Sequence, residues 1–438
     1  MAQANPSASA WNLRTATKKR LSPTVTYLLT ALCVSWPAFL VVGCALPSWA
    51  LGEADTPVSL AAIHTTILGV LLTIACGVLY QVVPIAFQAP PLPRHVLYWH
   101  LPLHLTGVIA MGTGFLLGHL RWTGLGGGMV VLGVAGYAVF LLQSYTRARN
   151  RTPVHRALLL PWLGLLWVFA TGLWQALLPI RTSPATVMNH VVAGGMVFWS
   201  GLVLVISYKF IPMFTLSHGY RVFLRATASL YFTGGAGLLL AAWLQAPASR
   251  WAYLAGSAMA LLGLASFTRD VVRIVRARKR KRMVLPVRWA LACVAVMVLC
   301  ETLVLVAANA GWSPVIPAAA FGWVYGGWLG MAYAYMHKIV PFLWFEYRFS
   351  HRPERKTAPL IDEMASRRLT VFGLTAYGAG VAAGVLYLLA GAWTAESAAW
   401  WLRLAAVAAG CGMTLGTLLW FVSLRRVLTI GGPRPEDG

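Results

Sequence analysis

The stretch HTTILGVLLTIACGVLYQVVP, from His64 to Pro84, decides the fold, because its last five residues set a pattern that recurs twice further along the chain. The pattern is an aromatic or imidazole ring, a long polar side chain, two apolar residues and a proline. It ends again at Pro212 (YKFIP) and at Pro341 (HKIVP). The three prolines are 128 and 129 residues apart (212 − 84 and 341 − 212), so the recurrence predicts three units of similar length.

The composition around these stretches is typical of a protein with many membrane spans. Of 438 residues, 59% are hydrophobic and 11% are charged, and the mean hydropathy is +0.69. Soluble domains carry roughly 25% charged residues, so soluble enzyme folds are excluded. The six cysteines lie in apolar stretches without C-x-x-C spacing, which indicates neither a disulfide framework nor a zinc knuckle.

Apolar stretches long enough to cross a bilayer follow one another along the chain. A bilayer core of about 30 Å needs roughly 20 apolar residues in a helix. Divided at prolines, glycines and charge clusters, the sequence predicts an all-α integral membrane protein with twelve transmembrane helices. Their expected limits are 24–47, 58–84, 96–118, 123–145, 157–180, 187–212, 222–246, 251–272, 286–309, 315–342, 368–392 and 399–424.

Basic residues are distributed unevenly between the two sets of connections. With twelve spans, both tails share one side with the connections after spans two, four, six, eight and ten. That side holds Arg147, Arg149, Arg151, Arg156, Arg273, Arg276, Arg278, Lys279, Arg280, Lys281, Arg282, Arg348, Arg352, Arg355 and Lys356. The other side holds little more than Arg121, Arg181 and Arg250, beside Glu53, Asp55 and Glu396. The asymmetry predicts a multi-pass protein of the prokaryotic cytoplasmic membrane with both termini in the cytoplasm.

The net charge of +24 needs no nucleic-acid partner, because these loops lie beside anionic lipid. The predicted units are 24–145, 146–272 and 273–424, between cytoplasmic tails at 1–23 and 425–438. The apolar stretch after the first tail is too long for a signal peptide. Each unit has an even number of helices, so the units run parallel and are expected to form three four-helix arcs with pseudo-threefold symmetry. Spans two, six and ten are the expected inner helices.

Two segments resemble a known family. Span two opens at His64, and span six opens with NHVVAGG at Asn189 and continues to YKFIPMFTLSHG from Tyr208. These histidine-started helices resemble those of heme-copper oxidase subunit I, especially its divergent nitric-oxide-reductase-like branches. That family has twelve helices in three arcs, as the repeat also predicts. The resemblance implies a heme-binding protein of the respiratory chain in the inner membrane, an oxidoreductase that transfers electrons or reacts with O2 or NO.

The resemblance also implies roles for two histidines. His64 stands where the family has an axial ligand of a low-spin heme, and His190 stands where it has a copper ligand. Span seven lacks the His-His pair that completes the family's copper site, and span ten lacks the His-x-His pair that ligates both hemes. The implied cofactors are therefore heme b and, with an incomplete ligand set, copper.

The residues themselves support several readings of these histidines. If spans two and six are adjacent, His64 and His190 can ligate one heme iron or share a copper ion. The alternative is two interfacial histidines bonded to backbone or headgroups. His100 and His104 share one face of span three at i and i+4, a spacing that suits a metal or a heme edge. The alternative explanation of His100 is that it belongs to the belt of aromatic side chains at the membrane surface, so His104 is the better candidate heme ligand.

A polar tier is predicted at the cytoplasmic ends of the inner helices. Its members are His337, Lys209, Lys338, Gln81, Tyr80 and Tyr208. Such a tier could bind a heme propionate or a quinone headgroup, or accept a proton that enters from the cytoplasm. His337 is also a further candidate heme ligand. The alternative is that the lysines snorkel to the membrane surface at the helix ends. Glu301, in the middle of span nine, is a candidate proton relay, or else makes a simple interhelical hydrogen bond.

Three functions remain open on these grounds. The first is a heme protein served by a cytochrome c or quinol electron donor, alone or with other membrane subunits. The second is a transporter of copper, heme or a small solute along the pseudo-threefold axis, using His, Met and Cys as transient ligands. The third is an assembly or structural partner that keeps the fold without a cofactor.

Overall fold

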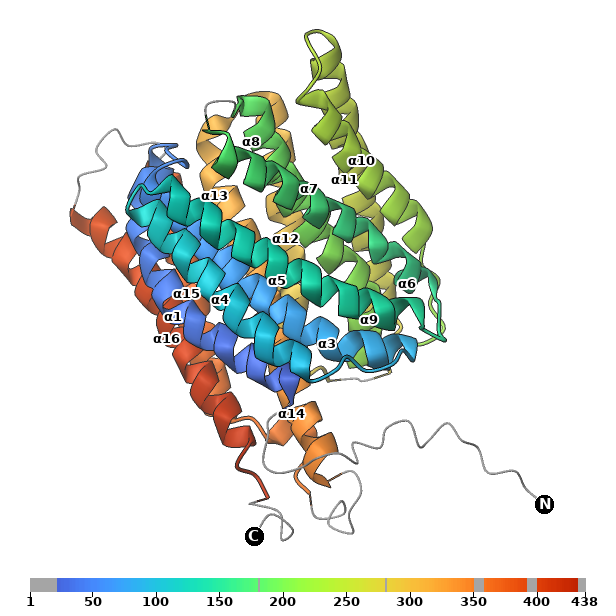
Figure 1. Ribbon diagram of the computed structural model, residues 1–438. Helices are drawn as coiled ribbons and strands as arrows, with labels where there is room; N and C mark the ends of the chain where they lie inside the picture. Colours follow the sequence, from blue (N-terminus) through green and yellow to red (C-terminus); the bar gives the residue numbers. More distant parts are fainter. Residues whose placement is uncertain (1–21, 180–181, 280–281, 350–357, 392–399, 432–438) are drawn as a thin grey trace.

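The chain folds as an all-helical bundle, which a computed structural model describes for residues 22–179, 182–279, 282–349, 358–391 and 400–431 (Figure 1). No β-strand occurs in these ranges beyond one isolated bridge between Ser217 and Arg278. The predicted all-α class is therefore confirmed. Arg181, Arg280, Lys281, Arg352, Arg355, Lys356 and Glu396 lie outside the described residues.

Long helices follow each other from one end of the bundle to the other. Some are continuous in direction but divided into α-helical, π-helical and 3-10 segments. In chain order the segments are α1 (Pro23–Ala50), α2 (Pro57–His64), η2 (Thr65–Leu72), α3 (Thr73–Phe87), α4 (His95–Leu116), α5 (Leu120–Thr146), α6 (Pro153–Ala157), α7 (Leu159–Leu177), α8 (Pro184–Val191), η4 (Val192–Ser200), α9 (Gly201–Thr215), α10 (Leu224–Ala241), α11 (Ala248–Arg276), α12 (Leu285–Ala310), η5 (Ser313–Val315), α13 (Ile316–Phe321), η6 (Gly322–Leu329), α14 (Gly330–Phe349), η8 (Ile361–Glu363), α15 (Arg367–Gly391) and α16 (Trp400–Val427).

Nine of the helical stretches in the described ranges are long and apolar enough to cross a membrane, which makes the chain a multi-pass membrane protein. They correspond to the predicted spans except 96–118, 222–246 and 251–272, where α4, α10 and α11 lie. Polar groups distinguish two of these three helices: α4 contains three histidines, and α11 ends with charged residues from Arg269 onward. Lipid-facing side chains such as Leu132 and Ile109 are more than two-thirds exposed, as contact with a bilayer requires.

Glycines bring neighbouring antiparallel helices into backbone contact in three places. The pairs α4–α5, α10–α11 and α15–α16 have the most extensive helix contacts. A Cβ added at Gly126 would lie 2.4 Å from the Met111 nitrogen, one at Gly234 would lie 2.5 Å from the Ala260 nitrogen, and one at Gly380 would lie 2.6 Å from the Met413 nitrogen. Small residues at membrane helix crossings permit this close packing.

The first and last helices close the bundle. α16 packs along α1, and a Cβ added at Gly43 of α1 would lie 3.1 Å from the Ala406 carbonyl (Figure 1). The helix that runs from α2 through η2 to α3, the one from α8 to α9, and the one from α13 to α14 are the most buried of the candidate spans. These are the helices that carry the repeated sequence pattern, and they lie inside the bundle as predicted.

Each inner helix contains a π-helical segment in its first half. The segments are η2, η4 and η6. In each of them one carbonyl accepts a hydrogen bond from a side chain of a neighbouring helix: Leu68 from His104 at 2.9 Å, Met196 from Tyr231 at 3.1 Å, and Tyr325 from Tyr377 at 2.7 Å. These carbonyls are 128 and 129 residues apart (196 − 68 and 325 − 196), the same spacing as the prolines.

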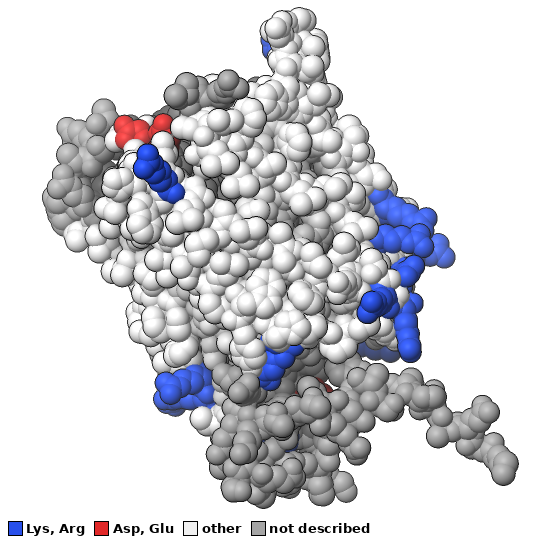
Figure 2. Space-filling model, in the orientation of Figure 1, with Lys and Arg blue, Asp and Glu red and all other residues white. Residues whose placement is uncertain are grey.

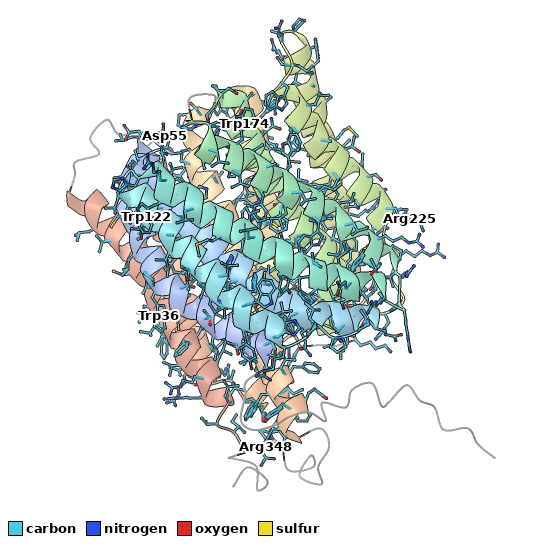
Figure 3. The ribbon with its side chains drawn as sticks, viewed as in Figure 1. Trp36, Asp55, Trp122, Trp174, Arg225 and Arg348 are labelled. Carbon is cyan, nitrogen blue, oxygen red and sulfur yellow. The ribbon has the colours of Figure 1, made fainter. Side chains whose placement is uncertain are left out.

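Charged side chains mark the two ends of the bundle. Figure 2 shows most of the visible Lys and Arg residues toward the end of the bundle where α3, α5, α9 and α11 finish. We call this end the basic end. Glu53 and Asp55 lie at the opposite end, in the turn after α1. Figure 3 places Asp55, Trp122 and Trp174 toward that opposite end, and Arg225 and Arg348 toward the basic end.

Candidate functional site

The structure brings His64 and His190 together. His64 is the last residue of α2, and His190 is near the end of α8, each one turn or less before a π-helical segment. Their ring centres are 6.1 Å apart, with 30° between the ring planes. The condition stated for a shared iron or copper ion, that spans two and six are adjacent, is therefore met at these histidines. The pair joins the first predicted unit to the second.

Hydrogen bonds define which nitrogen of each ring is free. The Nδ1–H of His64 donates to the Leu60 carbonyl at 2.8 Å. The Thr171 hydroxyl donates to the Trp167 carbonyl at 2.8 Å, so its oxygen accepts from the Nδ1–H of His190 at 3.3 Å. A neutral imidazole protonated at Nδ1 carries its lone pair on Nε2. Both Nε2 atoms thus have a lone pair, and neither is bonded to a described residue.

This arrangement is typical of ligating histidines, whose second nitrogen donates to a protein acceptor that orients the ring. Two imidazoles on opposite sides of one metal have nitrogens about 4 Å apart, since each metal–nitrogen bond is about 2 Å, and ring centres about 6 Å apart. The observed 6.1 Å fits that separation.

The walls of the site are aromatic and small. The Phe115 ring lies 4.8 Å from the His64 ring. A Cβ added at Gly172 would come within 2.9 Å of His190 Cε1, so a larger residue there would displace the imidazole. Among the described residues, no group of three or more His, Cys, Asp or Glu side chains gathers where a metal ion could bind. In the part of the chain that the structure describes, the site therefore offers two imidazoles without a third His, Cys, Asp or Glu.

A second buried cluster surrounds His100 and His104 of α4. Both side chains are fully buried, with ring centres 5.4 Å apart and nearly parallel planes. His100 Nδ1 and the Tyr27 hydroxyl form a 2.7 Å hydrogen bond, while His104 Nε2 donates to the Leu68 carbonyl. The aromatic-belt interpretation of His100 is wrong, because α1 and α5 cover it from lipid. His100 Nε2 and His104 Nδ1 have no partner among the described residues.

Glu301 meets Tyr231 in the middle of the bundle. The Tyr231 hydroxyl lies 2.5 Å from Glu301 Oε1, joining α10 to α12. Of the two open readings, the interhelical hydrogen bond is present, and its partner is Tyr231. Nearby, the Ser200 hydroxyl accepts from the indole nitrogens of Trp323 and Trp328 at 2.9 and 3.1 Å. Glu301 Oε2 has no described partner, so one carboxylate oxygen remains for a proton or a water.

The predicted polar tier is divided among local partners. Tyr80 donates to the Pro93 carbonyl at 2.6 Å. Tyr208 bonds to Asp270 at 3.0 Å. Lys338 forms an ion pair with Asp362, and His337 Nδ1 donates to the Tyr333 carbonyl at 3.0 Å. These bonds hold each side chain to its own surroundings, so no shared binding site is formed by the tier.

The remaining two members of the tier have no such bonds. Lys209 and Gln81 are partly exposed and make no side-chain hydrogen bond to described residues. Snorkelling therefore accounts for Lys209. Sequence reasoning missed the residues that orient the histidines, above all Thr171 and Tyr27, because their partners are distant along the chain.

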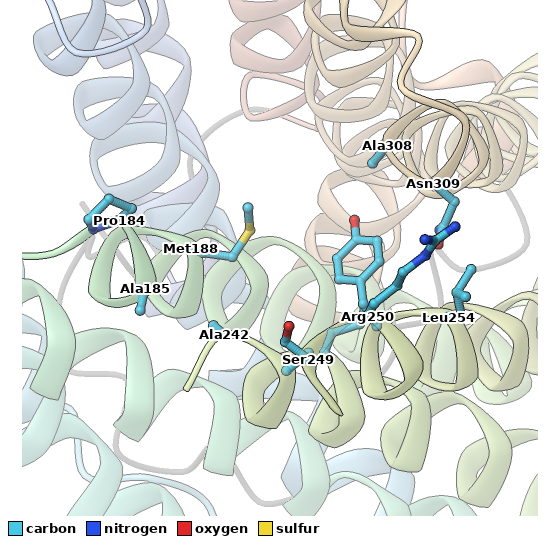
Figure 4. A pocket seen from close by; sticks show the side chains of 12 residues that line it. Pro184, Ala185, Met188, Ala242, Ser249, Arg250, Leu254, Ala308 and Asn309 are labelled. Atoms are coloured by element: carbon cyan, nitrogen blue, oxygen red, sulfur yellow. The ribbon is translucent and has the colours of Figure 1, made fainter. Parts of the chain in front are cut away.

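A cavity of about 460 Å³ lies at the end opposite the basic end, among α8, α10, α11 and α12 (Figure 4). It is lined by Pro184, Ala185, Met188, Leu238, Ala241, Ala242, Ser249, Arg250, Tyr253, Leu254, Ala308 and Asn309. Neither His64 nor His190 lines it. No protein-family model matches the chain, and no curated protein is similar to it.

Proposed function

We propose that the chain is a b-type heme protein of the membrane in which His64 and His190 are the two axial ligands. The observation that carries this proposal is the pair of imidazoles 6.1 Å apart whose Nε2 lone pairs are free and whose Nδ1 atoms are held by the protein. His64 and His190 would hold a heme through their Nε2 atoms, while the Nδ1 bonds keep both rings in the tautomer that this requires.

The number of ligands favours heme over a bare metal ion. Zinc and copper sites in proteins usually take three or four side chains, whereas a porphyrin supplies four nitrogens and leaves two positions to the protein. Two histidines without a third ligand suit the second case. Phe115 against His64 would also flank a porphyrin edge.

Electron transfer is the activity that fits such a heme. A heme held by both His64 and His190 would supply electron transfer, and O2 or NO chemistry would need one of the two histidines not to bind it. A quinol or a cytochrome c is the proposed electron donor, and other membrane subunits are proposed partners. Glu301, with its unpartnered oxygen beside Tyr231, is proposed to exchange a proton in the bundle interior.

The proposed architecture is twelve transmembrane helices in three four-helix arcs. Three π-helical segments with side-chain bonds at 128 and 129 residue intervals support it, as do the three glycine-lined helix pairs. The basic end is proposed to face the cytoplasm of a prokaryotic cell, with both termini on that side. In this arrangement His64 and His190 lie in the outer half of the membrane.

Copper held by the same two histidines is the second candidate. It is favoured by one observation: the two rings lie 6.1 Å apart with no further His, Cys, Asp or Glu gathered beside them among the described residues. Cu(I) accepts imidazole ligands and low coordination numbers. This reading corresponds to the metal-transport function.

Absorption spectroscopy of the purified protein tests both candidates. We expect a Soret band with split α and β bands on reduction, close to one heme in a pyridine hemochrome assay, and loss of most of this heme in His64→Ala and in His190→Ala. His218→Ala is the matched control, because His218 is exposed in a loop far from the pair along the chain.

Each outcome points to one function. Heme retained in full by both variants would contradict the axial assignment. A colourless protein with about one copper, lost in the same variants, would support the copper site instead. Protein with neither cofactor after expression with ample heme and copper would support an assembly or structural role.

A further inference from the structure

The cavity among α8, α10, α11 and α12 has the size of a ligand site. Its volume of about 460 Å³ lies within the usual range for bound small molecules. Apolar side chains line it from three helices: Met188 of α8, Leu238 of α10 and Leu254 of α11. Met188 and Leu254 are 46% and 37% exposed, so the apolar lining continues onto the outer surface of the bundle.

The segments of α11 and α12 that line the cavity also carry polar groups without partners. Arg250, Ser249 and Tyr253 line the cavity, and their side chains make no hydrogen bond or ion pair with any described residue. Asn309 uses its amide nitrogen on Ser257 and on the Leu305 carbonyl, which leaves its oxygen free. No Asp or Glu is among the lining residues, so nothing there neutralises the guanidinium. A free guanidinium beside two hydroxyl groups binds phosphate or carboxylate.

Tryptophans indicate the depth of the cavity in the membrane. Trp243, Trp251 and Trp312 follow or precede lining residues closely along the chain and are 56%, 68% and 61% exposed. Exposed tryptophans concentrate at the level of the lipid headgroups. The tryptophans therefore place Arg250 near the depth of lipid phosphates.

We propose that this cavity binds an anionic phospholipid. The phosphate contacts Arg250, with Ser249 and Tyr253 as further donors, and an acyl chain runs along Met188 and Leu254. The charge of Arg250, the absence of an acidic lining residue and the partly exposed apolar side chains of Met188 and Leu254 together select an anionic amphiphile over a neutral or fully soluble ligand. The proposal stands whether or not the histidine pair holds heme.

Native mass spectrometry of the detergent-purified full chain tests the site with phosphatidylglycerol as the probe. Diacylglycerol, which has the same chains without the phosphate, is the comparison lipid. We expect wild type to retain phosphatidylglycerol about tenfold better than Arg250→Gln, since a charge-assisted phosphate contact is lost. Arg121→Gln, at an exposed arginine of the same end of the bundle, is the matched control and should retain lipid like wild type.

Thermal unfolding separates a lipid site from a free-anion site. Phosphatidylglycerol should raise the Tm of wild type and of Arg121→Gln, and it should leave that of Arg250→Gln unchanged. Equal lipid retention by all three proteins, or equal binding of diacylglycerol, would overturn the proposal. Inorganic phosphate that raises the Tm as much as the lipid would show a site for free anions and would overturn the lipid assignment.

Discussion

At the scale of single residues, the bond from His104 to the Leu68 carbonyl holds α4 against the first inner helix, which runs from α2 to α3. The imidazole is fully buried, and the carbonyl belongs to the π-helical segment η2. His104→Leu should lower the free energy of unfolding by about 1–3 kcal/mol, because a buried acceptor loses its donor. His104→Gln keeps an N–H at a similar reach and should recover most of that loss. Thermal unfolding in detergent measures both variants.

An equal loss of unfolding free energy in His104→Leu and His104→Gln would show that a hydrogen bond to the Leu68 carbonyl does not contribute to stability. Heme content should stay near the wild-type value in His104→Gln, since the proposed ligands are His64 and His190. Heme loss in that variant without a change in Tm would move the ligand assignment to His104.

At the scale of helices, close contact across α4 and α5 depends on one glycine and not on its neighbour. A Cβ at Gly126 would lie within 2.5 Å of Met111 and Gly107 backbone atoms, whereas one at Gly128 meets nothing within 4 Å. Gly126→Ala should therefore cost about 1–3 kcal/mol by overpacking. Gly128→Ala should be neutral or gain up to about 1 kcal/mol, because alanine is the better helix former. Matched thermal melts in detergent check the pair.

If the helices cross as described, Gly126→Ala should lower the stability more than Gly128→Ala, and the reverse order would contradict this packing. A destabilised Gly128→Ala beside an unchanged Gly126→Ala would mean that α5 is rotated about its axis relative to α4.

The limits of the helices could be predicted from the sequence much better than the hydrogen bonds within and between them. Span limits follow from apolar length, so the second span, predicted at 58–84, is observed at 57–87. The π-helical segments could not be predicted, because TTILGVLL has the composition of any apolar helix and its altered hydrogen bonds depend on distant donors such as His104. His64 and His190 were predictable since each opens an inner helix. The bond between Tyr231 and Glu301 was not, because 70 residues separate them.

At the scale of the whole molecule, the two ends of the bundle differ in charge, and this difference gives the orientation. Arg225 belongs to the basic end, while Asp55 lies at the other (Figure 3). Lys and Arg are retained in the cytoplasm during insertion, so the end with Asp55 should face outward. Both residues are exposed, so a cysteine at either place is accessible to a reagent in water.

Labelling with a membrane-impermeant maleimide tests this orientation. In intact cells Asp55→Cys should react well above the wild-type background, and Arg225→Cys should react only after the membrane is permeabilised. The native cysteines set a low background because they lie within the helices. The reverse pattern would place the basic end outside, and the histidine pair would then lie in the cytoplasmic half of the membrane. An electron donor would have to reach the proposed heme from the cytoplasmic side, so a quinol or a cytoplasmic protein would replace an external cytochrome c.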